Sequence, residues 1–221
     1  MSTESIVECN NVYITSDRGE PIFKDVNLKL TAGRSVVISG AAASGKTTLV
    51  EMILGLRFPD SGSIELFGHC MRPKPRRLLN RIRRRIGGVG GVFGLVPTLT
   101  VAENVMFPLV LASERRRVRR ERLMKMLTEF KLLKQAPLYP RHLTRVEYTL
   151  AQFARASIAN QPLMIIDEPS AGLDPDTYER VFEYLVRVSL SGRSMIILTS
   201  QAETRQLPQC DYLKIENGCL S

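Results

Sequence analysis

Apolar residues near both ends of the chain recur in patterns typical of β-strands. Val26, Leu28 and Leu30 occupy every second position, which places them on one face of a strand. Residues 35–38 form a nearly continuous apolar run, as in a strand buried on both faces within a parallel sheet. The expected strands are residues 6–13, 22–30, 35–38, 63–67, 163–167, 194–199 and 212–216.

The middle of the chain carries the helical period instead. Residues 76–85 and 114–130 are expected to be helices, and the second places on one face Leu123, Met126, Leu127 and Phe130. A third helix, at about 146–160, is expected to bury Val146, Leu150, Phe153, Ala154 and Ile158. Further helices are expected at 46–56 and 176–190, on either side of this middle region.

These elements predict one α/β domain over residues 1–221. Its core would be formed by residues 1–90 and 159–221, and a mainly helical insertion would span about 72–158. The chain has 44% hydrophobic and 24% charged residues, which is ordinary for a globular protein and excludes disorder as the default.

Targeting signals and cysteine chemistry add little to this picture. No apolar run approaches the roughly 18 residues that a membrane-spanning helix needs. Residues 1–5 lack the basic start and apolar stretch of a signal peptide, so a cytoplasmic location is expected. The cysteines lie far apart without C-x-x-C spacing, as expected of free thiols in a reducing compartment; they are Cys9, Cys70, Cys210 and Cys219.

The net charge of +9 is concentrated in one region. Residues 72–122 contain 14 basic and three acidic side chains, with clusters at 76–85 and 115–122. Three interpretations remain open: a solvated helix face, an anionic membrane surface or charged partner loop, and nucleic acid. Nucleic acid is the least favoured, because no aromatic residues interleave with the arginines as a stacking platform would require.

The strongest chemical signal is a glycine-rich loop between an expected strand and an expected helix. It matches G-x-x-x-x-G-K-[ST], in which backbone N–H groups and a helix N-terminus surround phosphate. Lys46 would reach the β- and γ-phosphates of ATP, and the Thr47 hydroxyl would bind Mg²⁺. The expected nucleotide-binding residues are Gly40, Ala41, Ala42, Ala43, Ser44, Gly45, Lys46, Thr47 and Thr48.

A second signal follows the apolar strand at 163–167. Asp167 is placed to hold Mg²⁺ through water, and Glu168 to accept a proton from an attacking water. Together with the glycine-rich loop, the acidic pair predicts an ATPase site in which Glu168 and Lys46 are the candidate catalytic residues.

The run Asp167-Glu168-Pro169-Ser170-Ala171-Gly172-Leu173-Asp174 resembles the Walker B strand end, catalytic glutamate and D-loop of ABC ATPases. The resemblance extends over nearly the whole chain. It implies a P-loop NTPase fold with a RecA-like core, an ABC-type antiparallel β region and an α-helical subdomain. The chain also resembles the small subunits of lipoprotein-release, cell-division and phospholipid-trafficking systems, and the residues do not choose between them.

The resemblance also implies partners and a place of action. Such subunits form homodimers or heterodimers that sandwich two ATP molecules, with Ser170 and Asp174 in the D-loop. A transmembrane permease-type subunit would dock in a groove between the core and the helical insertion. The chain would then work in the cytoplasm, peripherally on the inner face of the membrane.

Several positions depart from the family pattern. The Q-loop, I-G-Y-V-F-Q in the family, has Gly91 in place of its glutamine. The signature L-S-G-G-Q is replaced by Leu143, Thr144, Arg145, Val146 and Glu147. Ser200 stands where the family has its switch histidine, and Ser16 where an aromatic residue stacks on adenine, with Tyr13 on the other strand face.

These departures leave open how active the protein is. Because the phosphate loop and both carboxylates are intact, Mg-ATP binding is expected in every case. The interpretation favoured here is an ATP-binding subunit of a membrane complex with weak or lost hydrolysis. The alternatives are a fully active transport ATPase with atypical loops, and a non-hydrolysing structural or regulatory subunit within a heterodimer.

Overall fold

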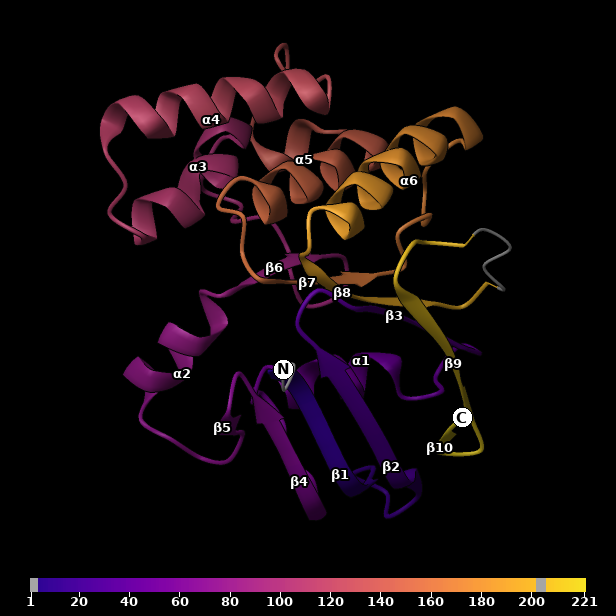
Figure 1. Ribbon diagram of the computed structural model, residues 1–221. Helices are drawn as coiled ribbons and strands as arrows, with labels where there is room; N and C mark the ends of the chain where they lie inside the picture. The colour runs from indigo at the N-terminus through magenta and orange to yellow at the C-terminus, as the bar shows by residue number, and fades with distance from the viewer. Residues whose placement is uncertain (1–3, 202–205) are drawn as a thin grey trace.

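Two β-sheets form the frame of the molecule (Figure 1). The first is antiparallel, in the order β2-β1-β4-β5, and the second has the order β10-β9-β3-β8-β7-β6, parallel except for β10. The strands are β1 (Ser5–Thr15), β2 (Pro21–Thr31), β3 (Ser35–Gly40), β4 (Ser61–Leu66), β5 (His69–Cys70), β6 (Ile86–Val89), β7 (Leu163–Asp167), β8 (Ser194–Thr199), β9 (Cys210–Glu216) and β10 (Cys219–Leu220).

The computed structural model describes residues 4–201 and 206–221. The expected absence of a signal peptide concerns residues 1–5, of which 1–3 lie outside the described residues. The helices are α1 (Lys46–Ile53), α2 (Arg76–Arg83), α3 (Val101–Leu111), α4 (Arg116–Glu129), α5 (Arg145–Ser157) and α6 (Pro175–Leu190), with a 3-10 turn at Pro140–His142.

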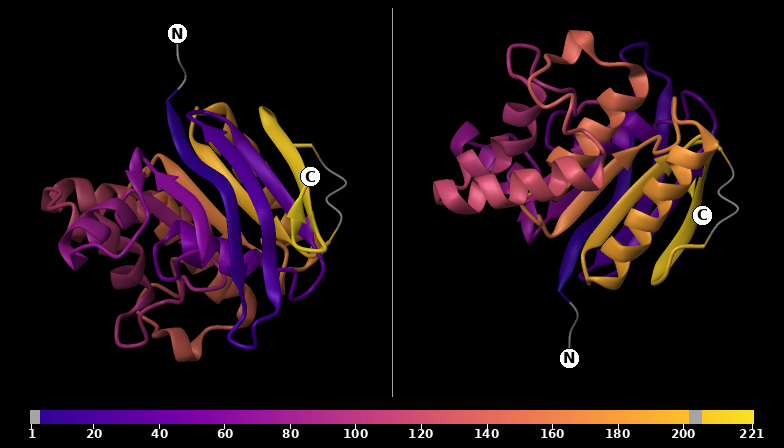
Figure 2. Two further views of the ribbon diagram at one scale, coloured as in Figure 1. Left: turned by 90° about the horizontal axis from the view of Figure 1, so that it is seen from below. Right: turned by 90° about the horizontal axis from the view of Figure 1, so that it is seen from above.

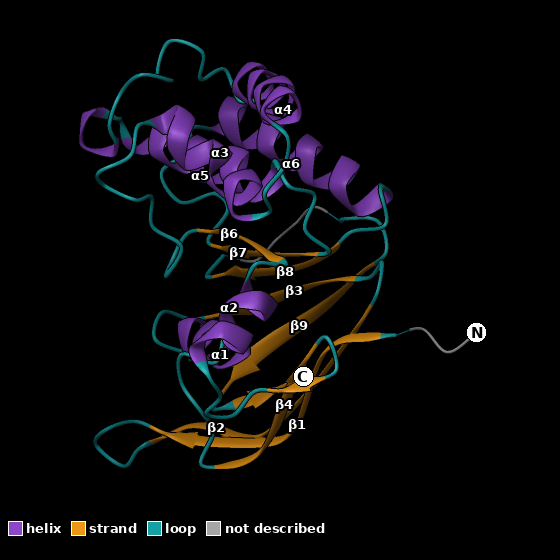
Figure 3. Cartoon of the chain, turned by 90° about the vertical axis from the view of Figure 1, so that its left-hand side faces the viewer, coloured by secondary structure: helices purple, strands orange, loops and turns teal. Residues whose placement is uncertain are grey.

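The parallel sheet separates two apolar cores. Along β3, Val36 and Ile38 face α1 and the antiparallel sheet, whereas Val37 faces the other helices. This alternation explains why the strand is apolar at successive positions: both of its faces are buried. Helices α3, α5 and α6 cover the second face, with α4 outside them (Figures 1 and 3). The antiparallel strands lie in front when the molecule is seen from below, and the helices when it is seen from above (Figure 2).

All seven expected strands are present, and 194–199 has the expected bounds. The expected helices are present too, but α1 ends at Ile53 and α5 begins at Arg145. Burial differs at three positions: Leu123, Met126 and Val146 are only half-buried, while the other side chains expected on those faces are buried.

Helix α3 and strands β5, β6 and β10 were not expected. Helix α3 is apolar almost throughout and contains Pro108, so it shows no clear amphipathic period. Its start was nevertheless marked, because Thr100 and Glu103 form a reciprocal capping box. Strand β6 carries two glycines, and Gly87 lies so close to Ala156 of α5 that a Cβ atom would meet the Ala156 carbonyl oxygen at 2.2 Å.

Two further expectations concern the surface and the thiols. Within the described ranges, no helix combines the length and apolar character needed to cross a bilayer. All four cysteines are free, and burial raises the pKa of Cys9 to about 12 and that of Cys210 to about 11. These two thiols are therefore protonated at neutral pH and unreactive.

Candidate functional site

The glycine-rich loop connects the end of β3 to the start of α1. Gly45 has a φ of 100°, in the left-handed region, and a Cβ atom there would lie 2.8 Å from the Phe23 ring. A Cβ atom at Gly40 would meet Ser44 Oγ at 2.5 Å. Both glycines are therefore required by the tight turn, which aims the helix N-terminus at the loop's interior.

The interior of this loop fits a phosphate chain. Lys46 is buried, and its Nζ donates to the carbonyl oxygens of Gly40 at 2.7 Å and Ala41 at 3.0 Å. Ser44 Oγ is buried and has no hydrogen-bond partner among residues 4–201 and 206–221. A buried hydroxyl without a partner is rare, and a phosphate oxygen would supply one. Residues 41–43 are exposed, so their backbone is open to a ligand.

Asp167 and Glu168 close the other side of the site, at the end of β7. Burial raises the pKa of Asp167, the charge of Glu168 raises it further, and Lys46 offsets part of the rise. No cluster of three or more His, Cys, Asp or Glu side chains exists in the described chain to hold a metal by itself. Thr47 and Asp167 would hold Mg²⁺ together with phosphate oxygens and water, and the ion would offset the negative charge of the phosphates.

Glu168 is held by two groups. Its Oε1 lies 3.7 Å from Lys46 Nζ. Its Oε2 accepts hydrogen bonds from the backbone N–H of Ser200 at 3.0 Å and from the Ser200 hydroxyl at 3.1 Å. The backbone of Glu168 has a φ of 56°, which is uncommon for a residue other than glycine. Ser200, at the position expected for a histidine, therefore contacts the candidate catalytic carboxylate directly.

Gly90 and Gly91 lie against Asp167 without room for a side chain. A Cβ atom at Gly91 would be 2.3 Å from Asp167 Oδ2, and one at Gly90 would be 2.0 Å from the Asp167 carbonyl oxygen. Both residues also have positive φ angles, 44° and 74° respectively. The position where the family has its glutamine is thus a glycine whose backbone packs directly on the candidate metal-binding carboxylate of Asp167.

Three residues of α5 that belong to no sequence motif hold this backbone path. Leu95 N–H donates to the Tyr148 hydroxyl at 2.8 Å, and Gln152 Nε2 donates to the Phe93 carbonyl at 2.9 Å. Arg155 donates to the carbonyls of Gly94, at 2.8 Å, and Phe93. The spacing 148, 152 and 155 places these polar groups on one helix face, which was the available signal.

The signature region at the start of α5 uses its polar groups internally. Thr144 Oγ1 accepts from Glu147 N–H at 3.3 Å, and Glu147 Oε2 accepts from Thr144 N–H at 2.8 Å. Gln135 Nε2 donates to the other oxygen of Glu147 at 2.7 Å. These hydrogen bonds, chiefly that from the Thr144 backbone, lower the pKa of Glu147. The backbone N–H groups of Thr144 and Glu147 are therefore already engaged, and Glu147 remains charged.

Arg145 and the D-loop meet within the same chain. A Cβ atom at Gly172 would lie 2.4 Å from Arg145 Nε and 2.5 Å from its Cδ, so the arginine lies directly across this glycine. Arg145, Glu168, Asp167 and Gly91 line one cavity of about 300 Å³. Asp174 caps α6 by accepting from Thr177 N–H at 2.9 Å, and hydrogen bonds from Thr177 lower its pKa. Ser170 lies in the preceding turn, where its carbonyl accepts from Leu173 N–H.

A hollow of about 540 Å³ adjoins the glycine-rich loop at Ala43 and Ser44. Ser16, at the position where the family has its base-stacking aromatic residue, lines this hollow, and Tyr13 does not. None of the described residues that line this hollow is aromatic. A nucleotide base placed here would have no ring on which to stack.

We therefore expect ATP and GTP to bind with affinities that differ by less than about fivefold, because one lost stacking contact forfeits on the order of 1 kcal/mol. Isothermal titration calorimetry with both nucleotides would measure the difference. A Lys46→Ala variant provides the control, since it should weaken both nucleotides equally. A preference for ATP well above tenfold would contradict the absence of a base platform.

Comparisons with known proteins identify relatives of this chain. A family model described as "ABC transporter" matches residues 23–171. The cell division ATP-binding protein FtsE of Bacillus subtilis (strain 168) is 28% identical over 215 residues, covering 97% of this chain and 94% of the relative. The methionine import ATP-binding protein MetN of Corynebacterium jeikeium (strain K411) is 32% identical over 196 residues, 88% of this chain. This chain spans only about half of that relative, 53% of its length.

A solved structure shows the same architecture. The dimeric ATP-binding cassette MJ0796, in a post-hydrolysis state bound to ADP and Pi, superposes with a TM-score of 0.86 at 28% identity. The match covers 97% of this chain and 96% of that one. The expected P-loop NTPase fold is thereby confirmed, and ATP with Mg²⁺ are the ligands of this family. With its family model covering more than half of the sequence, the chain belongs to the ABC transporter family as an ATP-binding cassette.

Proposed function

We propose that this chain is the ATP-binding subunit of a membrane complex, that it binds Mg-ATP with weak or lost hydrolysis, and that it acts on a transmembrane partner. The observation that carries the proposal is a contrast within one site. The phosphate loop, Lys46, Asp167 and Glu168 together surround the space for the phosphates. In the signature region, by contrast, the N–H groups of Thr144 and Glu147 are already hydrogen-bonded within the N-terminal cap of α5.

The binding half of the proposal rests on the cradle. Lys46 already lies among the carbonyls of the loop, and the unpartnered Ser44 hydroxyl points to a missing acceptor or donor. Thr47 is exposed at the start of α1, where a metal ion bound to phosphate could reach it. These features support Mg-ATP binding irrespective of how fast the nucleotide is hydrolysed.

The hydrolytic half rests on what surrounds Glu168. Gly91 has no side chain with which to position water. The Ser200 hydroxyl donates its hydrogen bond to the Glu168 carboxylate. Thr144 and Glu147 hydrogen-bond each other through their backbone N–H groups. Glu168 itself is intact, which favours residual activity over none when a motif-complete partner supplies the missing groups.

The proposal includes a dimer and a domain division. The solved structure of the cassette MJ0796 is dimeric, and we infer that this chain pairs similarly, with itself or with another ABC ATPase. We assign the core to residues 1–90 and 159–221, and the mainly helical insertion to about 72–158. From the similarity to the cell division ATP-binding protein, we further infer that the chain acts peripherally on the inner face of the membrane.

The arginines of α4 provide a prediction about the membrane. The side chains of Arg116, Arg117 and Arg120 are exposed. They belong to α4, which is the outermost helix in Figure 1. If they face anionic lipid, sedimentation with phosphatidylglycerol-containing vesicles should be measurable, and it should fade as ionic strength passes about 0.15 M. Neutral vesicles should bind poorly.

Matched charge reversals sharpen this measurement. Arg116→Glu combined with Arg120→Glu should abolish vesicle binding. Arg18→Glu combined with Lys29→Glu changes the net charge equally but at the antiparallel sheet, so it should have little effect. Equal binding to neutral and anionic vesicles would show that these arginines form a solvated face or a protein contact.

The experiment that tests the proposed function is a pair of measurements on the purified protein. Calorimetry should show Mg-ATP binding, and a phosphate-release assay should show little turnover beside a Glu168→Gln control. No ATP binding by the intact protein would refute the whole proposal, whereas rapid Glu168-dependent turnover would refute only its hydrolytic half.

A further inference from the structure

A cavity of about 300 Å³ lies beside the acidic end of β7. Asp167 and Glu168 form its acidic side, and Arg145, the first residue of α5, lines it from the helical region. No other lysine or arginine is found among the described residues that line this cavity. One cation therefore shares a concavity with the candidate metal-binding and catalytic carboxylates.

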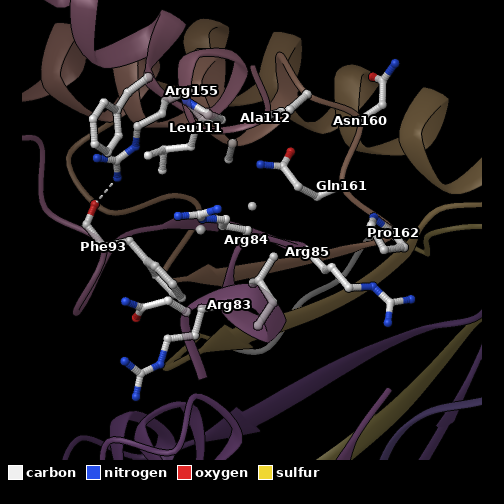
Figure 4. A pocket seen from close by; sticks show the side chains of 18 of the residues that line it. Arg83, Arg84, Arg85, Phe93, Leu111, Ala112, Arg155, Asn160, Gln161 and Pro162 are labelled. Atoms are coloured by element: carbon white, nitrogen blue, oxygen red, sulfur yellow. Dashed lines mark hydrogen bonds between the residues drawn. The ribbon is translucent and has the colours of Figure 1, made fainter. Parts of the chain in front are cut away.

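Hydrogen bonds already hold one wall of the cavity, which includes the backbone of Gly91 and Gly94. Arg155 donates to the carbonyl oxygens of Gly94 and Phe93, and Figure 4 shows the second of these bonds as a dashed line. Gln152 donates to the same Phe93 carbonyl at 2.9 Å. Helix α5 thus fixes this wall in place, so the cavity does not need a ligand in order to form.

The stem of Arg145 is held against the loop that follows β7. Its Nε and Cδ atoms lie 2.4 Å and 2.5 Å from the point that a Cβ atom at Gly172 would occupy. Arg145 is exposed, and no hydrogen bond or ion pair joins its guanidinium to residues 4–201 and 206–221. The structure therefore offers here a positioned cation that lacks an anionic partner.

Glu168 is not that partner, because both of its oxygens are engaged elsewhere. Its Oε1 lies 3.7 Å from Lys46 Nζ, and its Oε2 accepts from the backbone N–H and the hydroxyl of Ser200. Lys46 is also the group expected at the β- and γ-phosphates. The γ-phosphate of a nucleotide in the phosphate loop would thus lie beside Glu168, at the edge of the cavity that contains Arg145.

We propose that Arg145 binds the γ-phosphate of the nucleotide held by its own subunit, so that a single chain distinguishes ATP from ADP. This inference rests on the proposed function, since it requires Mg-ATP in the phosphate loop. A guanidinium binds phosphate oxygens through two parallel N–H donors, and such charge-assisted hydrogen bonds are stronger than neutral ones. ADP lacks the phosphate that Arg145 would contact, so only ATP gains from it.

Titration calorimetry with Mg-ATP and Mg-ADP tests the proposal on the full-length protein. Arg145→Gln should weaken ATP binding by about tenfold, as expected for one charge-assisted contact at a partly exposed site, and should leave ADP binding unchanged. Unchanged ADP binding also shows that the variant is folded. An ATP affinity equal to that of the parent, or an equal loss for both nucleotides, would overturn the proposal.

Arg141→Gln is the matched control, because Arg141 is an exposed arginine close to Arg145 in the sequence and does not line the cavity. It removes the same charge and should leave both affinities unchanged. A loss of ATP affinity in Arg141→Gln as large as that in Arg145→Gln would reduce the effect to net charge, which contradicts a direct contact.

A mixture of two variants shows which subunit's nucleotide Arg145 contacts. Lys46→Ala keeps Arg145 but has a weakened phosphate loop, whereas Arg145→Gln keeps the loop. The mixture should bind ATP no more tightly than Arg145→Gln alone, because each intact loop lies in a chain without the arginine. Recovery of the parent's ATP affinity would show that Arg145 reaches across a dimer, and the proposal would then be wrong.

The parent protein separates this proposal from the proposed function. If the parent binds ATP and Arg145→Gln binds it equally well, the γ-phosphate contact is rejected and the ATP-binding subunit stands. If the parent binds neither nucleotide, the subunit itself is rejected.

Discussion

Purified protein alone should release phosphate from ATP at a rate close to that of its Glu168→Gln variant. The candidate proton acceptor and metal-binding groups are in place, whereas Gly91, Ser200, Arg145 and Val146 stand where the family pattern has its glutamine, its histidine and two signature glycines. Loss of one such donor typically costs roughly 10²–10³ in rate, and the losses do not add when the groups act together. A coupled phosphate-release assay with both proteins measures the difference directly.

A heterodimer should behave differently from the isolated chain. A motif-complete partner would supply its own signature to the Lys46–Glu168 site and restore turnover there. The opposite site, capped by residues 143–147 of this chain, should remain inactive. Brisk, Glu168-dependent turnover by the unmodified protein alone would contradict this account and favour an ordinary transport ATPase.

Restoring the family's glutamine is not expected to rescue activity by itself. At Gly91 a Cβ atom would stand 2.3 Å from Asp167 Oδ2, and the backbone φ of 44° disfavours any side chain. Gly91→Gln would therefore displace either the loop or the metal-binding carboxylate. The Ser200→His substitution is less constrained by the backbone, although it removes a hydroxyl that now holds Glu168 at 3.1 Å.

Lys46→Ala should weaken Mg-ATP binding by about 10- to 100-fold, because it removes a charge-assisted contact worth roughly 1.5–3 kcal/mol from the β- and γ-phosphates. The lysine is also bound to two loop carbonyls and lies 3.7 Å from Glu168, so the variant loses these contacts too. Isothermal titration calorimetry gives the affinity.

Lys29→Ala is a suitable control for this substitution. It removes one positive charge from an exposed side chain on β2, remote from the phosphate loop. Its affinity for ATP should equal that of the parent protein. If Lys46→Ala also binds ATP with the parent's affinity, the loop does not hold phosphate as proposed.

The sequence was sufficient to place seven strands and the phosphate loop, because their signals are local, whereas the short strands β5, β6 and β10 were missed. Strand 194–199 is buried at every position, so its apolar run has clear ends. The phosphate loop needs only a strand, two glycines and a helix start in succession. Helix α3 was not predicted, because its apolar residues lie on all sides of the helix and give no amphipathic period. The capping box of Thr100 and Glu103 was the local signal for its first residue.

The use of the unusual side chains could not be predicted from the sequence. Ser200 meets Glu168 across 32 positions, and Arg155 meets Gly94 across 61. Such contacts depend on which strand ends and helix faces the fold brings together, and no local pattern encodes them. Glu147 stands where the family signature ends in glutamine, and its carboxylate is the partner of Thr144 and Gln135.

The contact between Arg145 and Gly172 has a mechanical consequence within a single subunit. The arginine's stem lies on a backbone that leaves no space for even one more carbon atom, so the two segments can approach each other only if Arg145 changes its rotamer. A tilt of α5 toward the loop behind β7 would therefore press first on the backbone four residues beyond Glu168. This contact lies within one subunit and needs no second subunit to form.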